Sequence, residues 1–543
     1  MTKFIVITGG VLSGLGKGIV TSSLGKLLKS HGLSVTAIKV DPYLNCDAGT
    51  MNPFEHGEVF VLRDGTEVDL DLGNYERFLD TELTGDDNIT TGKVYRSVIE
   101  KERSGEYLGK TVQIIPHITD EINRRIWKVA DDTNSDIILI EMGGTVGDIE
   151  SAPFLEASRQ LHMELGDDSK NLIFIHTTLV PVLSVVGEQK TKPTQHSVQE
   201  LRAIGIEPDI IVGRSDNKLD KSTKKKISLF CDVPVEAVVS SPNANNIYQV
   251  PLILDDEGMT SYVIKKMGLE EIIQERKEQA TGMVEWKEFL ESYENPTSEI
   301  TIALVGKYCD LKDAYTSHEE ALNHCRAATK TKINIKYIES EDLEKEDHKN
   351  LLSDVDGILI PGGFGTRGIN GKINAVNYAR INDIPILSIC LGFQVSVIEF
   401  ARNVLGYEDA NSSEFDERTE HPVIDFMPMQ RGIDMMGGTM RLGAEKVLLD
   451  EGTRAFEIYG EEEIEERHRH RYEVNLDFKE EIEENGMVFS GKSHNQKRME
   501  ILEITEHPFF MGCQFHPEFC SRPMKPAPLF LAFVKAIIEQ KGK

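Results

Sequence analysis

The chain has 543 residues, enough for two large α/β units or about three to four smaller domains. Apolar residues make up 40% and charged residues 28%, which is typical of a globular enzyme and unlike a disordered, collagen-like or coiled-coil chain. The 60 basic and 90 acidic side chains give a net charge of −30, which argues against nucleic acid or an anionic membrane as a partner. No apolar run approaches the ~20 residues of a membrane span, and seven scattered cysteines without a CxxC pair favour a reducing cytoplasm.

The first half of the chain predicts a parallel sheet. Short apolar runs, typical of buried strands, alternate with segments of helical periodicity. These runs occupy residues 4–8, 35–40, 137–141, 172–176 and 210–212. Because helical segments separate the strands, we expect the strands to pair in parallel.

A charged helical stretch over residues 269–299, closed by Asn-Pro-Thr-Ser, indicates a linker between two bodies. Strand-like runs then resume at residues 301–305, 333–338, 357–361 and 384–390. The second body is therefore expected to be a layered α/β unit as well. We predict one domain over residues 1–268, a linker over 269–299 and a second domain over 300–543.

A glycine-rich segment over residues 9–18 follows the first predicted strand and precedes a helical pattern. Backbone N–H groups of such a turn can approach phosphates at a helix N-terminus, and Lys17 can reach the β and γ oxygens. The spacing departs from the Walker A pattern, because five residues separate Gly10 from Gly16 and Gly18 stands at the position of the Mg²⁺-binding hydroxyl. Another group must therefore hold the magnesium.

Carboxylates at strand ends are the natural substitutes for that hydroxyl. Asp71 lies in an Asp-Leu-Asp-Leu-Gly run, and Glu141 closes a predicted strand just before two glycines. Lys39 lies at a second strand end and suits a phosphate contact near Lys17. The alternatives are a glycine-rich turn without a ligand and two solvated loop carboxylates.

A second motif predicts a nucleophile. An apolar strand runs directly into Cys390, Gly392 follows two residues later, and a helical pattern comes next. This is the pattern of a nucleophile elbow with cysteine in place of serine, and a thiolate at a helix N-terminus is a ready nucleophile for acyl transfer. Near the C-terminus His516 offers a base, and Glu518 can fix the tautomer of its imidazole. The alternative is a buried structural cysteine.

The Pro-Gly-Gly-Phe-Gly run at residues 361–365 follows another predicted strand. Its small residues allow a backbone N–H to face a developing oxyanion, together with the N–H of Leu391. These two groups complete the elements that hydrolysis of an amide requires.

The motifs carry a resemblance to known families. The C-terminal half resembles the class I glutamine amidotransferases. The N-terminal motifs, with Lys-Thr-Lys-Pro-Thr-Gln-His-Ser at 190–197 and Arg-His-Arg-His-Arg-Tyr at 467–472, resemble the CTP synthase family over essentially the whole chain. The resemblance implies an α/β fold: a P-loop-like N-terminal domain, with a parallel sheet between helices on both faces, and a C-terminal class I glutamine amidotransferase α/β domain.

The resemblance also implies a glutamine-hydrolysing, ATP-dependent ligase of pyrimidine biosynthesis that aminates UTP to CTP. Phosphorylation turns the 4-oxygen of uracil into a good leaving group, and ammonia from glutamine displaces the phosphate. Ammonia released inside the protein reaches a high effective concentration, so a passage between the two sites is implied. The family further implies Mg²⁺, feedback inhibition by CTP, activation by GTP and a cytoplasmic homotetramer that could form filaments, with no nucleic-acid or membrane partner.

Carried over to this chain, the resemblance implies five groups of site residues. The triad is Cys390, His516 and Glu518. ATP would contact Gly14, Leu15, Gly16, Lys17, Gly18, Ile19 and Asp71, and Mg²⁺ would contact Asp71 and Glu141. UTP or CTP would contact Ser13, Asp148, Ile149, Glu150, Lys190, Thr191, Lys192, Pro193, Thr194, Gln195 and Lys226. Glutamine would contact Gly363, Leu391, Gly392, Phe393, Gln394, Glu414 and Arg471.

Two positions need comment against this family pattern. Ser388 stands where the elbow usually has glycine, so we expect a tighter turn and an altered glutaminase rate. Arg367, in a Gly-Thr-Arg-Gly stretch, is a candidate for GTP sensing, with a solvated loop arginine as the alternative.

Two other functions keep the same motifs. A cobyrinic-acid-type amidase shares the fused architecture but would amidate carboxylates; the 190–197 segment and Lys226 speak against it, and a UTP-binding assay separates the two. A non-enzymatic scaffold built on a dead synthase is the other alternative. The intact Lys17 and triad speak against a scaffold, and turnover with UTP, ATP and glutamine decides it.

Overall fold

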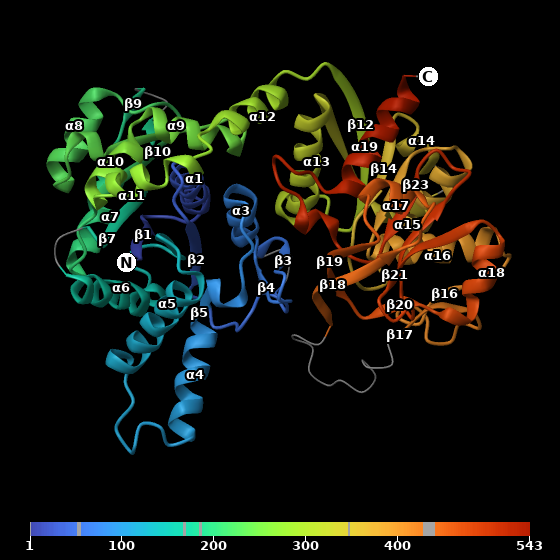
Figure 1. Ribbon diagram of the computed structural model, residues 1–543, viewed down its shortest axis with the longest axis horizontal. Coiled ribbons are helices and arrows are strands. Elements are labelled where there is room, and N and C mark those ends of the chain that lie inside the picture. Colours follow the sequence, from blue (N-terminus) through green and yellow to red (C-terminus); the bar gives the residue numbers. More distant parts are fainter. Residues whose placement is uncertain are drawn as a thin grey trace. The chain divides into compact units, whose positions relative to one another are not determined.

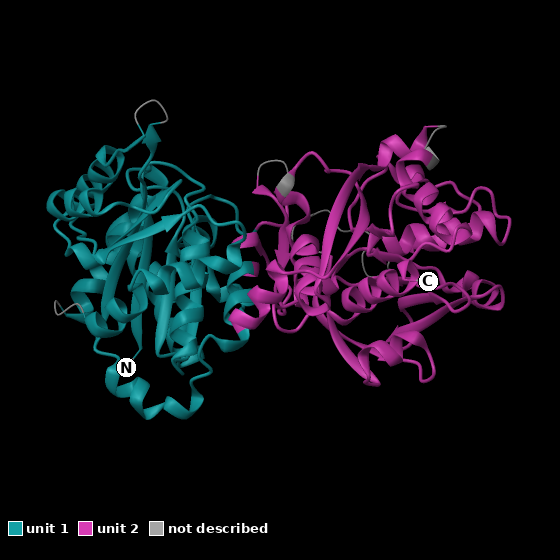
Figure 2. Ribbon diagram, turned by 90° about the horizontal axis from the view of Figure 1, so that it is seen from above, with its two compact units in different colours: residues 1–47, 74–285 teal, residues 48–73, 286–543 magenta. Residues whose placement is uncertain are grey.

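The computed structural model describes residues 2–51, 56–166, 170–183, 187–345, 348–426 and 440–542. The chain forms two compact units, residues 1–47 with 74–285 and residues 48–73 with 286–543 (Figure 2). The segment 48–73, which comes early in the sequence, thus groups with the second unit. The predicted sequence domains with limits at 268 and 300 stay a prediction.

The first unit is built on a seven-stranded sheet in which all pairs are parallel, in the order β11-β10-β7-β1-β6-β2-β5. Figure 1 labels β1, β2, β5, β7 and β10 of this sheet. Five of its strands contain the five predicted runs, which confirms the parallel sheet. The two others, β5 and β11, are short and were not predicted. The strands are β1 (Lys3–Gly9), β2 (Val35–Asp41), β5 (Asn88–Thr90), β6 (Ile137–Met142), β7 (Leu172–Leu179), β10 (Ile210–Ser215) and β11 (Val238–Pro242).

Helices cover both faces of this sheet, as predicted. Side chains alternate between the faces, so that Phe4 and Ile138 lie in one hydrophobic cluster with residues of α4, α5 and α6. On the other face, α1 lies so close that a Cβ on Gly25 would come within 2.9 Å of Leu139. The helices are α1 (Lys17–Ser30), α4 (Thr91–Arg103), α5 (Thr119–Thr133), α6 (Ala152–Leu165), α7 (Lys192–Ala203), α8 (Lys221–Cys231), α9 (Val250–Asp256), α10 (Met259–Met267) and α11 (Glu270–Glu275).

The second unit has a nine-stranded mixed sheet in the order β13-β12-β14-β15-β23-β22-β21-β18-β19. The strands from β13 to β23 pair in parallel, and those from β23 to β19 pair antiparallel. They are β12 (Ser298–Gly306), β13 (Thr331–Glu339), β14 (Gly357–Ile360), β15 (Ile386–Ile389), β18 (Arg441–Leu449), β19 (Glu463–His470), β21 (Met487–Ser493), β22 (Met499–Ile504) and β23 (Phe510–Cys513). The predicted runs fall on its parallel part.

Two hydrophobic clusters fill the two sides of this sheet, which gives the predicted layers. Ile358 and Ile360 of β14 lie in one cluster with α15 and α16, whereas Leu359 lies in the other cluster with α13 and α19. The helices are α12 (Val284–Glu294), α13 (Thr316–Thr329), α14 (His348–Leu352), α15 (Ile369–Ile381), α16 (Leu391–Asn403), α17 (Arg454–Tyr459), α18 (Lys479–Glu484) and α19 (Pro528–Lys541). A small sheet adds β16 (Asn411–Ser412), β17 (Pro422–Phe426) and β20 (Tyr472–Val474).

The segment 48–73 carries the antiparallel hairpin β3 (Val59–Val61) and β4 (Glu67–Asp69), which leads into α3 (Leu70–Leu79). The hairpin is bound to β19, because Arg467 donates to the carbonyl oxygen of Val61 at 3.0 Å and Arg469 contacts Glu67 at 2.7 Å. Among the described residues, none of the helices has the length and apolar character that crossing a membrane requires.

Candidate active sites

The predicted phosphate loop joins β1 to α1. Gly14 and Gly16 have φ values of 74° and 80°, which favour glycine, and no heavy atom lies within 4 Å of a Cβ built on either residue. Helix α1 begins at Lys17, so its first N–H groups lie at the end of the loop. Nζ of Lys17 donates to the carbonyl oxygen of Gly144 at 2.6 Å. An open left-handed turn, a helix N-terminus and a lysine together form a suitable cradle for phosphate.

The phosphate loop rests on the helix that carries the 190–197 motif. A Cβ on Gly10 would come within 2.6 Å of Ser197 on α7 and 2.9 Å of His176 on β7. The ring of His176 lies 2.9 Å from both the Thr8 and the Ser197 hydroxyl oxygens. Burial and the charge of Lys17 lower the pKa of His176 to about 3, so this ring is neutral. The apolar strand around it hid His176 from sequence analysis.

Glu141 lies near the end of β6, and its buried carboxylate contacts Lys39 and Tyr75. Nζ of Lys39 lies 2.9 Å from Oε1, and the hydroxyl of Tyr75 donates to Oε2. Each carboxylate oxygen has a second lone pair, so this hard oxygen donor fits Mg²⁺. Asp71 lies in the first turn of α3, within the segment that groups with the second unit. Its pairing with Glu141 at a metal, and a phosphate contact of Lys39, stay predictions.

The residues predicted for the pyrimidine nucleotide fall into an exposed and a buried set. Ser13, Ile149, Glu150, Lys192 and Lys226 are exposed, and Lys190 and Pro193 are half-buried. Thr191, Thr194 and Gln195 are buried, and the amide of Gln195 donates to Thr191 Oγ1 at 2.9 Å. Lys192 lies over the ring of Phe230 on α8, 5.9 Å from its centroid. The exposed lysines of α7 and α8 thus form a local basic group on an acidic protein.

Cys390 lies at the turn between β15 and α16. Its φ of 52° and ψ of −100° are strained for a non-glycine residue, as in a nucleophile elbow. The Cys390 N–H donates to the carbonyl oxygen of Cys513 at 2.7 Å, which holds the turn. A Cβ on Gly392 would come within 2.3 Å of the carbonyl oxygen of Ile360, so only glycine fits the first turn of the helix.

The structure brings His516 and Glu518 together with Cys390. Nδ1 of His516 donates to Oε1 of Glu518 at 2.7 Å, and the carboxylate is fully buried. Burial would lower the pKa of His516, but the charges of Glu518 and Cys390 raise it to about 10. A Cβ on Gly362 would lie 2.9 Å from His516 and 3.6 Å from Cβ of Cys390, which places the loop at 361–365 against the triad.

Two buried lysines that sequence analysis missed hold this loop at both ends. Nζ of Lys372 on α15 donates to the carbonyl oxygen of Pro361 at 2.8 Å. Nζ of Lys307, after β12, donates to that of Phe364 at 2.8 Å. Burial, with the neighbouring charge of Lys307, lowers the pKa of Lys372 to about 7, and burial lowers the pKa of Lys307 to about 8. For Lys372, the signal was a lysine within an otherwise buried helical face.

Leu391 and Glu414, two of the residues predicted for glutamine, lie against the same loop. Oε1 of Glu414 accepts from the N–H of Gly365 at 3.0 Å, and Lys307 and Arg471 act electrostatically on its carboxylate. The amide of Gln394 donates to the carbonyl oxygen of Tyr472 at 3.0 Å. Phe393 is fully buried in the core, so its side chain cannot face a ligand. Glu414 and Arg471 are thus the charged pair best suited to the amino and carboxylate groups of an amino acid.

Ser388 and Arg367 have definite partners. The hydroxyl of Ser396 donates to Ser388 Oγ at 3.0 Å, so the extra hydroxyl under the elbow is satisfied inside α16 and β15. Arg367 donates to Glu341 at 2.8 Å and lies 5.4 Å from the ring of Tyr308. A GTP contact of Arg367 stays a prediction.

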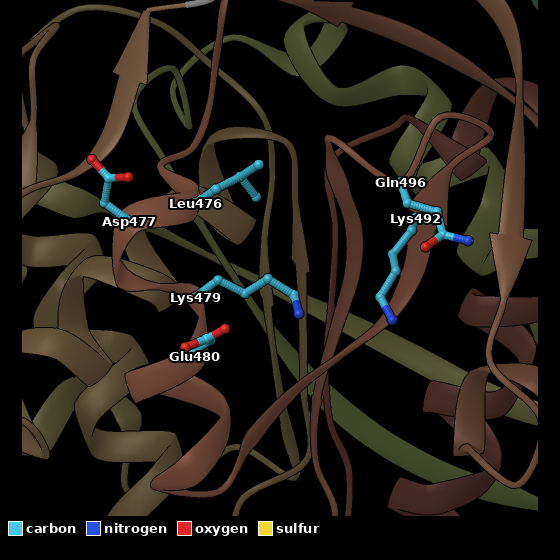
Figure 3. Close-up of a pocket in the computed structure, with 6 residues that line it drawn as sticks. All are labelled: Leu476, Asp477, Lys479, Glu480, Lys492 and Gln496. Atoms are coloured by element: carbon cyan, nitrogen blue, oxygen red, sulfur yellow. The ribbon is translucent and has the colours of Figure 1, made fainter.

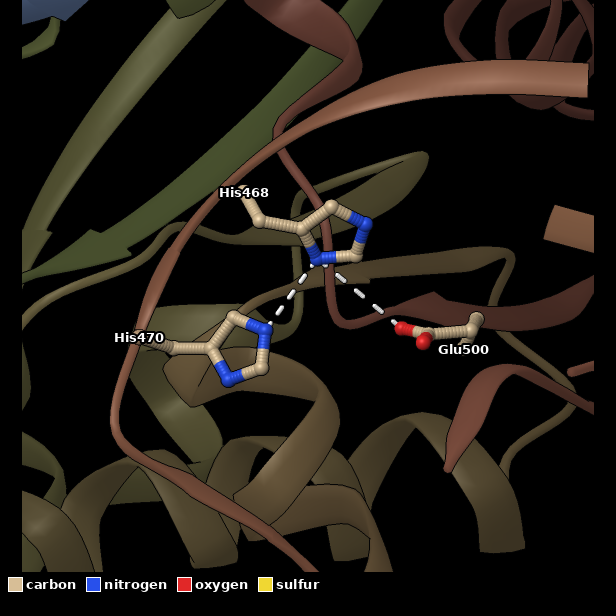
Figure 4. Close-up of side chains that lie close together, drawn as sticks. All are labelled: His468, His470 and Glu500. Atoms are coloured by element: carbon tan, nitrogen blue, oxygen red, sulfur yellow. Dashed lines mark hydrogen bonds and ion pairs between the residues drawn. The ribbon is translucent and has the colours of Figure 1, made fainter. Parts of the chain in front are cut away.

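A cluster of buried polar side chains lies on β19 and β22, near His516. His468, His470 and Glu500 bring possible ligand atoms within 4.8 Å of one another (Figure 4). Arg441 lies 2.8 Å from Glu500 and 3.4 Å from His470, and burial together with the charge of Arg441 lowers the pKa of both histidines far below the usual range. The guanidinium already supplies the cation, so this cluster is best interpreted as a buried polar network.

A surface pocket near α18 is lined by Leu476, Asp477, Lys479, Glu480, Lys492 and Gln496 (Figure 3). Its two lysines are each paired, Lys479 with Glu483 at 2.7 Å and Lys492 with Asp450 at 2.5 Å. None of the predicted site residues lines it.

Comparison with known proteins shows the family to which the chain belongs. A family model described as CTP synthase N-terminus matches residues 3–269, and one described as glutamine amidotransferase class-I matches residues 310–536. The chain is 57% identical over 542 residues to a CTP synthase of Pyrococcus abyssi, with 100% of this chain and 99% of that one covered. It is 57% identical over 539 residues to a CTP synthase of Archaeoglobus fulgidus, with 99% of each chain covered. The chain therefore belongs to the CTP synthase family and carries a class I glutamine amidotransferase domain.

Proposed function

We propose that this chain performs the CTP synthase reaction: ATP phosphorylates the 4-oxygen of UTP, and ammonia released from glutamine displaces that phosphate to give CTP. The observation that carries the proposal is the combination, in one chain of this family, of the phosphate cradle at Lys17 and the Cys390–His516–Glu518 triad. An enzyme that amidates carboxylates would not bind uracil, and the match to the CTP synthase N-terminus model argues against this alternative. A scaffold would not need the triad geometry.

At the glutaminase site, the thiolate of Cys390 attacks the amide carbon of glutamine. The N–H groups of Leu391 and of the loop at 361–365 stabilise the oxyanion that forms. His516, kept protonated by Glu518, gives its proton to the nitrogen that leaves as ammonia. Water then attacks the thioester, with His516 as the base, and glutamate leaves.

At the synthetase site, the loop glycines and Lys17 bind the ATP phosphates, with Gly14, Leu15, Gly16, Gly18 and Ile19 as the backbone contacts. Mg²⁺, which Glu141 and Asp71 would hold, supplies charge that offsets that of the transferring phosphoryl group. Lys17 stabilises charge on the β and γ oxygens and keeps them in line with the uracil oxygen. Ammonia then attacks carbon 4 of the resulting phosphate ester, the bond from carbon 4 to the ester oxygen breaks, and inorganic phosphate leaves.

Binding of the triphosphate that UTP and CTP share would explain how one pocket could serve both nucleotides. Lys190, Lys192 and Lys226 would bind the triphosphate that both nucleotides share, while Ser13 and the segment Asp148, Ile149 and Glu150 would face the ribose or base. We extend the proposal to feedback inhibition by CTP, activation of the glutaminase by GTP and a cytoplasmic homotetramer, which could form filaments. The seven cysteines are unpaired by disulfides, in keeping with a reducing compartment.

The test is turnover of the purified full chain with UTP, ATP, Mg²⁺ and glutamine, followed by absorbance of the cytosine product. We expect CTP formation that needs all four components, with ammonium salts able to replace glutamine. Absence of CTP with both nitrogen sources, in a chain that stays folded, would overturn the proposal.

A further inference from the structure

Glu58 precedes the hairpin of segment 48–73 and is fixed on the first turn of α13. Its N–H donates to the carbonyl oxygen of Asp313 at 3.0 Å, and its Oε2 accepts from the N–H of Ser317 at 2.8 Å. The side chain is 9% exposed. The carboxylate therefore lies at a helix N-terminus, where the helix dipole favours a negative charge.

His318, on the same turn of α13, lies between two carboxylates. Nδ1 is 3.8 Å from Oε1 of Glu58, and Nε2 is 3.4 Å from Oε1 of Glu518. Neither ring nitrogen has a hydrogen-bond partner among the described residues, although the side chain is only 5% exposed. The rings of Tyr315 and Phe530 enclose the imidazole edge-on, with centroids 5.9 and 6.3 Å away. A buried imidazole in this place can interact with both carboxylates at ion-pair distance.

The carboxylate oxygen that faces His318 is also the one that orients the catalytic base. Oε1 of Glu518 accepts from Nδ1 of His516 at 2.7 Å. Burial alone would raise the pKa of Glu518, but His318 and His516 together lower it. Glu58, His318, Glu518 and His516 thus form a continuous line of charged or titratable groups that ends at the triad.

The hairpin contacts His516 by a second route. The ring of Phe60 packs edge-on against Phe519 at 4.9 Å, and Phe519 stacks on the ring of His516 at 5.1 Å. The backbone N–H of His516 donates to the carbonyl oxygen of Arg467 at 2.8 Å, and the guanidinium of Arg467 donates to Val61. Both the ring and the backbone of the base therefore depend on neighbours of the hairpin.

We propose that His318 is a positioning residue of the glutaminase triad. The contact of Glu58 with α13 restrains His318, and His318 in turn restrains Glu518 and so orients His516. The inference deepens the proposed function and rests on it, because it concerns the same glutamine hydrolysis. Glu58 lies within the stretch matched by the CTP synthase N-terminus model, whereas Glu518 lies in the amidotransferase match. The triad is therefore oriented by a residue of the sequence domain that binds the nucleotides.

The chemistry of the link is electrostatic restraint. The imidazole of His318 lies 3.8 Å from Oε1 of Glu58 and 3.4 Å from Oε1 of Glu518, and its place between the two carboxylates keeps Oε1 of Glu518 on the line between the two histidines. The groups that face it are Glu58 from segment 48–73, Glu518 after β23 and the uncharged rings of Tyr315 and Phe530, while Glu319 and Glu320 flank it on α13. Without the carboxylate of Glu58, His318 faces the carboxylate of Glu518 alone. The side chain of Glu518 can then move more, because His318 is no longer restrained on its other side.

The experiment compares Glu58→Gln, His318→Gln and the double variant, in the full chain. Glu58→Gln keeps an oxygen for the Ser317 N–H and removes the charge. The matched control is Glu299→Gln, an exposed carboxylate of the same unit paired with Lys332. Glutaminase kcat, KM for glutamine and the pH profile of kcat are measured beside ammonia-dependent CTP formation.

We expect each single variant to lower glutaminase kcat about 10-fold with KM changed less than about twofold, because Glu518 orients the base rather than binding substrate. The alkaline limb of the pH profile should move to lower pH. The double variant should lose no more than either single one, since both act through one link. Ammonia-dependent synthesis and the Glu299→Gln control should match wild type.

Wild-type kcat and pH profile in folded His318→Gln, or losses that add in the double variant, would overturn the proposal. Equal loss of kcat with an unmoved pH profile would also overturn it, because that result indicates a packing role only. Absence of glutaminase activity in the wild-type chain would contradict the proposed function, a failure that is distinct from these.

Discussion

Nζ of Lys372 lies 2.8 Å from the carbonyl oxygen of Pro361, immediately before Gly362, which lies against the triad. The lysine is fully buried, and burial lowers its pKa to about 7. A buried amine of this kind is costly, so its hydrogen bond to the loop must be maintained for the fold to tolerate it. The relationship ties the oxyanion loop to α15.

Replacement of Lys372 by an apolar side chain of similar length tests the role of its hydrogen bond to Pro361. Lys372→Met should lower glutaminase kcat by about 10- to 100-fold, because the Pro361–Gly362 peptide is no longer fixed and the oxyanion donors lose alignment. Ammonia-dependent CTP formation should stay at the wild-type level. The control is Lys332→Met, an exposed lysine of the same unit. Full glutaminase activity in folded Lys372→Met would show that the hydrogen bond is irrelevant to catalysis.

Removal of the negative charge of Glu518 should shift the pH dependence of glutamine hydrolysis. The folded-state pKa of His516 is raised from 6.5 to about 10, so its imidazolium persists through neutral pH and is lost as the pH rises through about 10. Glu518→Gln removes part of the cause, so the alkaline limb of kcat/KM should move toward neutrality, and kcat should fall by about 10² or more. Steady-state glutaminase rates between about pH 6 and about pH 11 measure this. An unmoved limb would mean that another group controls it.

Lys17→Ala should abolish CTP formation from both nitrogen sources, since the phosphoryl step precedes attack by ammonia. Loss of such an electrostatic clamp costs about 10² or more in rate. Glutaminase turnover should persist, because Cys390 lies in the other compact unit. The measurement is CTP formation with ammonium salt and, separately, glutamate release. Ammonia-dependent synthesis near the wild-type rate would contradict the ATP-site assignment.

CTP should compete with UTP, because the two share ribose and triphosphate. Lys190→Ala should weaken both, as its contact is to the shared phosphates. Glu150→Ala should weaken CTP inhibition more than it raises the UTP requirement, since a carboxylate accepts hydrogen bonds from an amino group that uracil lacks. Inhibition constants at several UTP concentrations measure this. A non-competitive pattern that survives Lys190→Ala would place the inhibitory site elsewhere.

The sequence was sufficient for five strands of the first sheet and for the parallel part of the second, because short apolar runs between helical segments leave a local signal. Strands that end in glycine loops also led to the prediction of Cys390 and His516 as catalytic residues. The link from Glu58 through His318 could not, since a lone histidine in a helix and a carboxylate about 260 positions earlier carry no joint pattern. His176 and Lys372 were missed for a related reason: each lies in a buried element whose pattern predicts core packing. The grouping of segment 48–73 with the second unit is likewise a tertiary fact, which depends on contacts such as that of Arg467 with Val61.

The most direct test of the account is the activity of Cys390→Ala with two nitrogen sources, beside Cys231→Ala, a buried cysteine of the first unit, as control. The account predicts that Cys390→Ala loses glutamine-dependent CTP formation and keeps ammonia-dependent synthesis, whereas the control keeps both. If folded Cys390→Ala retains glutamine-dependent synthesis, or loses synthesis from ammonia as well, the division of the reaction between a glutaminase triad and a separate phosphate site is wrong.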